Sequence, residues 1–434
     1  MAVAVAAATD LVRVATRAFP FGRSRGPDCR GRVPGALVAP PAHEPVMASS
    51  ASAAHTATME LGLYFATNRA HEGADRWHPD RYGRAFSSDG MENLRFGWLS
   101  VDVDERAVQR CLDVDTGFGR GSGNDLATLC TKAAKRARIE AYPEKIDAAQ
   151  SETNQPKAKL GSKAMFSDLQ RDMLKRCDVL VFVHGFNVSW EEAVGSALAL
   201  QVMQNRDGVG DPQQQTAVVL FSWPSDGLAL PFVSYKSDRS EAKGSGYAFA
   251  RGLLKLRDHL AALADRANGG ACPQDLHLLC HSMGNYVLQN ALERMRQFTP
   301  GSALPRLFDH VFLCAPDVDD AVLEPGQPMG DLHQLARTVS VYHNTGDVAL
   351  HVSDYTKGNP DRLGSAGAAR AGLLPDKVEQ VDCSAIVGGL VEHSYHLDGR
   401  VADDILRSID GVPADHPTRG RVRKVGPGVR WQLR

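Results

Sequence analysis

The chain has 434 residues, of which 43% are hydrophobic and 23% charged, and its formal net charge is −2. This length permits one large domain with additions or two to three smaller ones, and the composition is that of a soluble globular protein. A net charge so close to zero argues against a nucleic-acid partner. No run of about 18 apolar residues predicts a membrane span. The eight cysteines are scattered, without a CxxC pair or zinc-type spacing, which favours reduced thiols and a cytoplasmic location.

The first part of the chain differs from the rest. Residues 1–58 are rich in Ala, Arg, Gly and Pro, which predicts a disordered N-terminal extension. The Arg-rich, acid-poor composition also resembles an organelle transit peptide, and Met47 and Met59 are alternative starts. Residues 59–163 are predicted to hold N-terminal strands and a helical, polar insertion joined to the core. Their glycine-rich stretch "TGFGRGSG" fits no nucleotide-binding motif, so we expect a flexible connector there.

Residues 164–412 alternate between strand and helix patterns. Strands are predicted in "CDVLVFVHG", "TAVVLFSW", "LHLLC", "HVFLCAP", "TVSVYHN" and "KVEQVDCS", with amphipathic or apolar helical segments between several of them. This order predicts an α/β fold, with a mostly parallel central sheet covered by helices on both faces. Ligands bind such sheets at the carboxyl ends of the strands. Residues 413–434 are predicted to form a basic, solvated C-terminal tail, with an anionic surface as an alternative contact.

The stretch "LHLLCHSMGNYVL" carries the main functional signal. An apolar strand ends at Cys280-His281-Ser282-Met283-Gly284, and an amphipathic helix pattern begins at once. A nucleophile elbow needs small residues two positions before and after its serine, because the turn from strand to helix is tight. The usual form is G-x-S-x-G, and here Cys280 takes the first small position. The pattern predicts Ser282 as a nucleophile, whereas the alternative is a serine that only caps the helix.

Acyl transfer also requires backbone N–H groups directed at the developing oxyanion. Met283, the residue after the nucleophile, is expected to supply one donor. The loop "VFVHGFN" is expected to supply the other through Phe186, with Gly185 allowing close approach of the backbone. A plain strand-to-helix turn would explain the glycine but not the His-Gly pair that closes the strand.

The base and its orienting acid should follow the serine in the order acid, then histidine. Asp347 follows the strand "TVSVYHN", and His393 and His396 follow the last strand. Asp317 and Asp319, after "HVFLCAP", are the competing acids. We favour Asp347, while spacing alone leaves His393 and His396 open.

The chain resembles the alpha/beta-hydrolase superfamily, and more closely a bacterial family of alpha/beta hydrolases of unknown function. The residues that carry this resemblance are "YFATNR", "FVHGFNVSWEEA", "FSWPS", "HSMGN", "CAPDVD", "NTGDVAL" and "HSY". The resemblance implies an alpha/beta-hydrolase fold, with Ser282 as nucleophile, His393 as base and Asp347 as acid. It also implies an oxyanion hole formed by Phe186 and Met283. It implies no substrate.

These observations predict a serine hydrolase that cleaves a carboxylic ester through an acyl-enzyme, with no metal or organic cofactor. An acyltransferase, a thioesterase or an amidase would use the same residues, and a silent hydrolase fold that serves as a binding module is the alternative from another class. The expected partner is a small-molecule ester or acyl substrate; only the basic termini point to a membrane surface, and the sequence indicates no oligomeric state. The stretch "DGLALPFVSYKSD" is predicted to be either an apolar wall for the substrate or a loop packed on the core. Its candidate substrate-binding residues are Leu228, Leu230, Phe232 and Tyr235.

Overall fold

The computed structural model describes residues 57–434 with the exception of 118, 145–159, 175–177, 207–214, 226–230, 267–273, 302, 351–360 and 388–392. All but two residues of the predicted N-terminal extension therefore lie outside the described part of the chain. The described residues form a sheet of eleven strands and a separate two-stranded hairpin. The strands of the sheet, from one edge to the other, are β12 (Arg421–Arg423), β13 (Val429–Leu433), β11 (Val378–Asp382), β10 (Ala336–His343), β9 (Phe308–Cys314), β8 (Leu276–His281), β6 (Asp178–Val183), β7 (Thr216–Ser222), β1 (Thr58–Thr67), β4 (Arg95–Asp104) and β5 (Arg138–Ala141). The hairpin consists of β2 (Arg69–Glu72) and β3 (Arg81–Phe86).

The strands from β13 through β11, β10, β9, β8, β6 and β7 to β1 are all parallel to their neighbours. Only the edge strands β12, β4 and β5 pair antiparallel. The prediction of a mostly parallel sheet is therefore confirmed. Because the central strands share one direction, the loops after β6, β8, β9, β10 and β11 emerge at the same edge.

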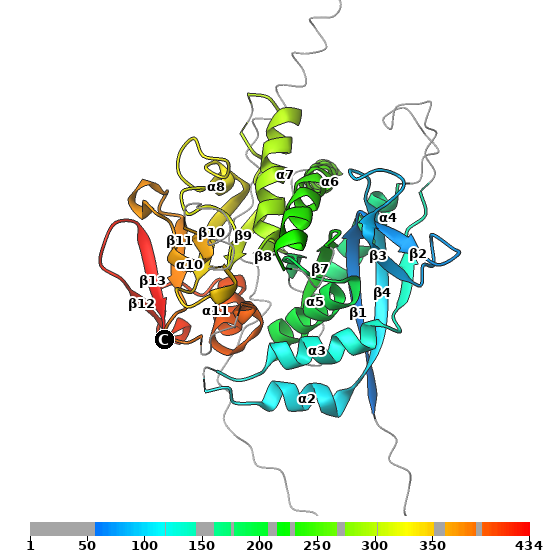
Figure 1. Cartoon of the computed structure of the whole chain (residues 1–434), viewed down its shortest axis with the longest axis horizontal. Helices are drawn as coiled ribbons and strands as arrows, with labels where there is room; N and C mark the ends of the chain where they lie inside the picture. The colour runs from blue at the N-terminus through cyan, green and yellow to red at the C-terminus, as the bar shows by residue number, and fades with distance from the viewer. Residues whose placement is uncertain are drawn as a thin grey trace, which may run out of the picture.

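Helices cover both faces of the sheet (Figure 1). One face packs against α4 (Gly161–Met173), α6 (Pro231–Arg266), α7 (Gly284–Phe298), α8 (Leu332–Leu335) and α10 (Leu363–Ala366). The other face packs against α2 (Glu105–Asp113), α3 (Gly123–Ala134), α5 (Trp190–Asn205) and α11 (Gly399–Ile409). Successive side chains of a strand point to opposite faces, so Leu278 and Cys280 join the first core and Leu279 joins the second. Burial on both faces explains why these strands are apolar throughout.

Local signals also form as predicted at α5. The Ser189 hydroxyl accepts a hydrogen bond from the Glu192 amide, and the Glu192 carboxylate accepts one from the Ser189 amide, which completes a capping box. No helix in the described ranges has the length and apolar character needed to cross a membrane.

The glycine-rich stretch that we expected to be a flexible connector is instead closely packed. Gly119 and Gly121 adopt positive φ angles. A Cβ at Gly123 would lie 1.9 Å from the carbonyl oxygen of Leu397. The Asp398 carboxylate accepts hydrogen bonds from the Gly123 and Asn124 amides at 2.6 and 3.1 Å, so it satisfies free donors at the start of α3. The prediction of flexibility was wrong, because the glycines permit close backbone contact.

The C-terminal residues do not form the solvated tail that their basic composition predicted. Strand β13 pairs with β11, and the side chains of Arg419 and Arg421 are buried against Asp404 of α11. The Arg421 guanidinium also contacts the Glu379 carboxylate at 2.7 Å. Burial alone would raise the pKa of Asp404, but Arg421 and Arg419 lower it below its usual value. The basic residues thus serve as internal counter-ions that attach the last strands to the sheet.

Candidate active site

Ser282 lies in the tight turn between β8 and α7, at the carboxyl edge of the sheet. Its φ angle is +51°, a left-handed conformation that is costly for a residue with a side chain. The two other non-glycine residues with positive φ in the described part of the chain are Asn187 and Ala315. They lie in the loops after β6 and β9, the two strands that flank β8. Backbone strain is therefore concentrated around Ser282, as is common at functional sites.

Two glycines allow the loops around Ser282 to approach one another closely. A Cβ on Gly185 would lie 2.8 Å from the Ser282 Cβ, and a Cβ on Gly284 would lie 2.6 Å from the Val183 carbonyl oxygen. Real Cβ atoms do not approach other atoms this closely, so any larger residue would force the loops apart. The loop after β6 consequently lies directly against the serine turn.

The backbone N–H groups of Phe186 and Met283 belong to the two segments that meet at this junction. Within the described residues, neither amide donates a hydrogen bond, although those of Asn187, Val188 and Asn285 do. Met283 is fully buried and immediately precedes α7. Unpaired buried amides are rare in folded proteins. At the start of a helix they form a preorganised anion-binding position.

Asp347 and His393 are in direct contact. The Asp347 Oδ2 accepts a hydrogen bond from the His393 Nδ1 at 2.7 Å. The other carboxylate oxygen of Asp347 accepts one from the Leu350 amide at 3.3 Å. The aspartate side chain is 1% exposed, whereas the histidine ring is 20% exposed. The carboxylate is thus shielded from water, and the imidazole reaches solvent.

The competing candidates make other contacts. His396 is buried, and neither of its ring nitrogens forms a hydrogen bond within the described residues. Burial lowers the pKa of His396 to about 3. The side chains of Asp317 and Asp319 contact Arg362 at 3.3 and 2.7 Å. Of the residues that the sequence left open, the structure brings His393 and Asp347 together and leaves the others apart.

His281 supports the position of His393 from the serine side. Its Nε2 donates a hydrogen bond to the His393 carbonyl oxygen at 3.1 Å, and the centroids of the two rings are 4.8 Å apart. Burial, together with the nearby His396 and His393, lowers the pKa of His281 well below its usual value, so this ring stays neutral. The residue next to Ser282 in sequence therefore holds the backbone of the histidine loop.

Sequence reasoning did not anticipate the polar cluster that supports the loop after β6. The buried Arg69 donates to the Val188 carbonyl at 2.8 Å and to the Ser222 hydroxyl at 2.9 Å. Burial lowers the pKa of Arg69 to about 9. Trp223 donates its backbone N–H to the His184 Nε2 at 3.1 Å. The motifs "YFATNR" and "FSWPS" carried these residues, but no spacing rule connected them to the loop.

Asp238 of α6 also holds this loop. Its carboxylate accepts hydrogen bonds from the Asn187 amide at 3.1 Å and from the Ser225 hydroxyl. The Ser225 hydroxyl in turn accepts from the Val188 amide at 3.2 Å. These bonds satisfy the amides of Asn187 and Val188, whereas the Phe186 amide donates no hydrogen bond within the described residues.

The expected substrate wall is only partly described. Leu228 and Leu230 lie outside the described residues, as does the side chain of Phe232. The stretch that we treated as a loop is helical from Pro231 onward, because α6 begins there. Tyr235 packs against Phe186, with ring centroids 5.6 Å apart. The hydroxyl of Tyr235 donates to the Asp317 Oδ2 at 2.8 Å.

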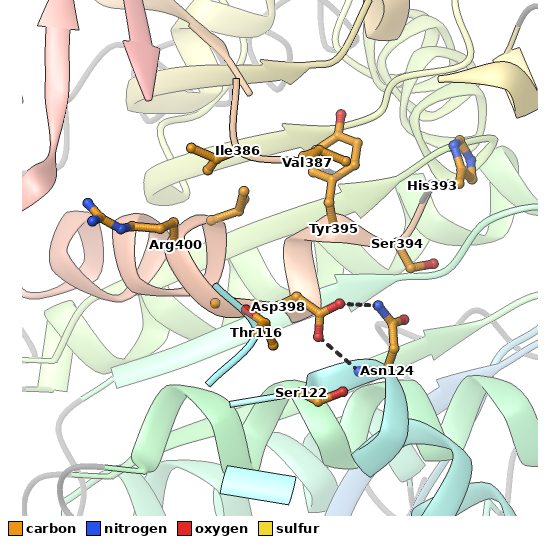
Figure 2. A pocket seen from close by; sticks show the side chains of 12 residues that line it. Thr116, Ser122, Asn124, Ile386, Val387, His393, Ser394, Tyr395, Asp398 and Arg400 are labelled. Carbon is orange, nitrogen blue, oxygen red and sulfur yellow. Dashed lines mark hydrogen bonds between the residues drawn. The ribbon is translucent and has the colours of Figure 1, made fainter. Parts of the chain in front are cut away.

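A cavity of about 480 Å³ lies beside His393. Figure 2 shows His393 at one end of its lining and Arg400 at the other, with Tyr395 between them. The hydrogen bonds from Asn124 to Asp398 hold the opposite wall, which belongs to the start of α3. Ser282 does not line this cavity.

One group of side chains among the described residues has the composition of a metal site. The ligand atoms of His277, Asp309 and His310 lie within 4.8 Å of one another. The Asp309 carboxylate is already paired with Arg337 at 2.7 Å. His277 is the second residue of β8, near the end opposite Ser282, and lies roughly 16 Å from that serine at the rise of an extended strand. This group belongs to the other edge of the sheet from the candidate active site.

The comparison with protein families agrees with this geometry. Residues 162–401 match a family described as alpha/beta hydrolase of unknown function (DUF900). The chain belongs to this family. The match includes every strand from β6 to β11 and the loops that carry Ser282, Asp347 and His393. The predicted alpha/beta-hydrolase fold is thereby confirmed, while the family description assigns no substrate. No curated protein matches the chain.

Proposed function

We propose that this alpha/beta hydrolase cleaves carboxylic esters through Ser282, His393 and Asp347. The observation that carries the proposal is the 2.7 Å contact between His393 Nδ1 and Asp347 Oδ2, formed by loops after different strands. The strained turn at Ser282 and the unpaired amides of Phe186 and Met283 support the same reaction. Acyl transfer requires a nucleophile, a base, an orienting acid and an oxyanion site.

In the first step, the Ser282 Oγ attacks the ester carbonyl carbon and His393 Nε2 accepts the hydroxyl proton. Asp347 keeps the Nδ1 proton in place, which fixes the tautomer and stabilises the imidazolium. The carbonyl oxygen becomes an oxyanion that accepts hydrogen bonds from the Phe186 and Met283 amides. Collapse of the tetrahedral intermediate breaks the ester C–O bond, and the leaving alkoxide takes the proton from His393.

In the second step, His393 removes a proton from water, which attacks the acyl-enzyme carbonyl. The same amides hold the second oxyanion, and the Ser282 oxygen leaves with the proton returned by His393. The products are a carboxylic acid and the free enzyme. The cavity beside His393 is suited to the alcohol, because the leaving oxygen must lie next to the imidazole that protonates it.

The direct test is labelling of the full chain with a fluorophosphonate probe, followed by mass spectrometry of the modified peptide. Labelling of wild type at Ser282 is expected, with none in Ser282→Ala. The change His393→Ala should abolish or strongly slow labelling, because the serine loses its base. The matched control is His333→Ala, because this half-buried histidine bonds only the Gly330 carbonyl among the described residues, and it should label like wild type.

Two outcomes would contradict the proposal. Labelling at a serine other than Ser282 would place the nucleophile elsewhere. A correctly folded wild type that neither labels nor hydrolyses p-nitrophenyl esters would indicate a hydrolase fold used for binding.

A further inference from the structure

Arg239 is a half-buried arginine that packs against α7, the helix after Ser282, and forms no ion pair with a carboxylate among the described residues. The guanidinium carbon of Arg239, in α6, is 3.9 Å from the ring centroid of Tyr286. Tyr286 lies four residues after Ser282, in the first turn of α7. The only hydrogen bond that Arg239 donates within the described residues is a long one, at 3.4 Å, to the Tyr235 hydroxyl. Its position on α6 therefore brings a fixed positive charge to the start of the helix that follows the serine.

Short contacts connect this charge to the reacting centre. The Tyr235 hydroxyl donates to the Asp317 Oδ2 at 2.8 Å, and the Asp317 amide donates to the Ser282 carbonyl oxygen at 3.2 Å. The Tyr235 ring also packs on Phe186, whose amide we assign to the oxyanion site. Arg239 thus lies on the Phe186 side of Ser282, whereas the 480 Å³ cavity lies on the His393 side.

The nearby carboxylates are engaged with other groups. Asp317 contacts the buried Arg362 at 3.3 Å, and Asp238 accepts hydrogen bonds from Asn187 and Ser225. No ion pair joins Arg239 to an acidic side chain in the described part of the chain. Burial opposes the charged form of Arg239, but Tyr235, Tyr286 and the Asp317 carboxylate favour it and together raise the pKa of Arg239 above its ordinary value. Arg239 is therefore a charged side chain that stacks on the Tyr286 ring.

The two sides of Ser282 have different roles in the proposed reaction. The alcohol must lie beside His393, which protonates it, so the acyl chain extends away from His393. We assign the acyl chain to the side of Ser282 that carries Phe186, Tyr235 and Arg239, none of which lines the cavity beside His393. The rings of Phe186, Tyr235 and Tyr286 provide apolar surface, and the guanidinium of Arg239 stacks on Tyr286. A planar fork of N–H donors is suited to bidentate binding of a carboxylate.

We propose that Arg239 binds a terminal carboxylate on the acyl chain, so that the preferred substrates are half-esters of dicarboxylic acids. This inference rests on the proposed ester hydrolysis at Ser282. A single guanidinium with Asp317 close by favours one negative charge over the double charge of a phosphate monoester. Arg239 is then a specificity residue, and the apolar rings define the length of the chain between the carbonyl and the acid.

The test compares esters of equal length with and without the terminal acid. For wild type, kcat/KM is measured on p-nitrophenyl half-esters of glutaric, adipic and pimelic acids and on the uncharged esters of pentanoic, hexanoic and heptanoic acids. Wild type should prefer the charged member of at least one pair. In Arg239→Gln this preference should fall at least tenfold, mainly through KM, and Arg239→Lys should retain part of it. High salt should weaken only the charged substrates.

Arg294→Gln is the matched control. Arg294 also stacks on aromatic rings, those of Tyr247 and Phe298, but it lies further along α7. This variant should keep the wild-type preference. An equal ratio of charged to uncharged turnover in wild type and Arg239→Gln would overturn the inference and leave the ester hydrolase intact.

A binding measurement separates the inference from the proposed function. Adipate should raise the thermal unfolding temperature of Ser282→Ala and should not raise that of the double variant with Arg239→Gln. Equal shifts, or no shift in either protein, contradict the carboxylate site even if no ester is hydrolysed. Absence of fluorophosphonate labelling contradicts the hydrolase separately.

Discussion

The change Gly185→Ala tests the close contact between the two loops of the candidate site. The added Cβ would lie 2.8 Å from the Ser282 Cβ and 3.2 Å from the His281 Nδ1. Carbon atoms in contact are about 3.5–4.0 Å apart, so the loops must separate by about 1 Å. A displacement of that size between reacting groups lowers the rate on the order of 10²-fold. We expect fluorophosphonate labelling and kcat/KM for an uncharged p-nitrophenyl ester to fall by about this factor.

Gly185→Ala is expected to affect the free energy of unfolding less, relative to its total value, than it affects activity. Overpacking of this kind costs about 1–3 kcal/mol, which urea unfolding measures independently of activity. Gly252→Ala is the control, because Gly252 lies inside α6 and its added Cβ would meet only the end of the Leu94 side chain, at 3.1 Å. That variant should retain full activity. Wild-type labelling in a stable Gly185→Ala protein would refute the argument that this loop must lie directly against Ser282.

Three further predictions concern the acid, the C-terminal strands and the buried histidines. Asp347→Asn should lower kcat by about 10⁴-fold, because asparagine holds the wrong histidine tautomer, and circular dichroism should show that the protein stays folded. A decrease in kcat of less than tenfold would argue against Asp347 as the acid. Arg421→Met should lower the free energy of unfolding by about 3–5 kcal/mol in urea, since it leaves Asp404 buried with less compensation, whereas the exposed Arg423→Met should have little effect. Stability should fall as pH drops below about 6, by at most 1.4 kcal/mol per pH unit for each buried histidine, because the unfolded state binds a proton that the folded state binds only at lower pH. Burial lowers the pKa values of these histidines to about 3 for His184 and His396 and about 4 for His343. Urea unfolding at pH 7, 6 and 5 measures that slope, and an unchanged stability at pH 5 would contradict it.

Much of the central fold was predictable because its signals are local. Strands buried on both faces must be apolar along their whole length. The runs that form β6, β7, β8 and β9 could therefore be predicted without knowing which strands they pair with. The capping box at Ser189 and Glu192 needs only residues three positions apart. The turn at Ser282 could be predicted for the same reason, because the strand, the nucleophile and the helix follow one another within a few residues.

The failures came from contacts between distant segments. Composition predicted a solvated basic tail, but Arg419 and Arg421 find Asp404 and Glu379 in a folded protein. The glycine-rich stretch was expected to be flexible, yet its glycines admit the backbone near Leu397. Neither partner is identifiable from spacing along the chain.

The same division applies to the candidate site. The sequence by itself determined which residues stand at strand ends, because hydrophobic runs and tight turns are encoded by neighbours in the chain. It named Ser282, Asp347 and His393 but could not choose between His393 and His396 by spacing. Only the tertiary structure decided that His393 bonds to Asp347 and that the competing acids, Asp317 and Asp319, contact Arg362. It also decided that Arg239 stacks on Tyr286. Those contacts depend on the order of strands in the sheet and on helix packing, which bring together side chains from loops far apart in sequence.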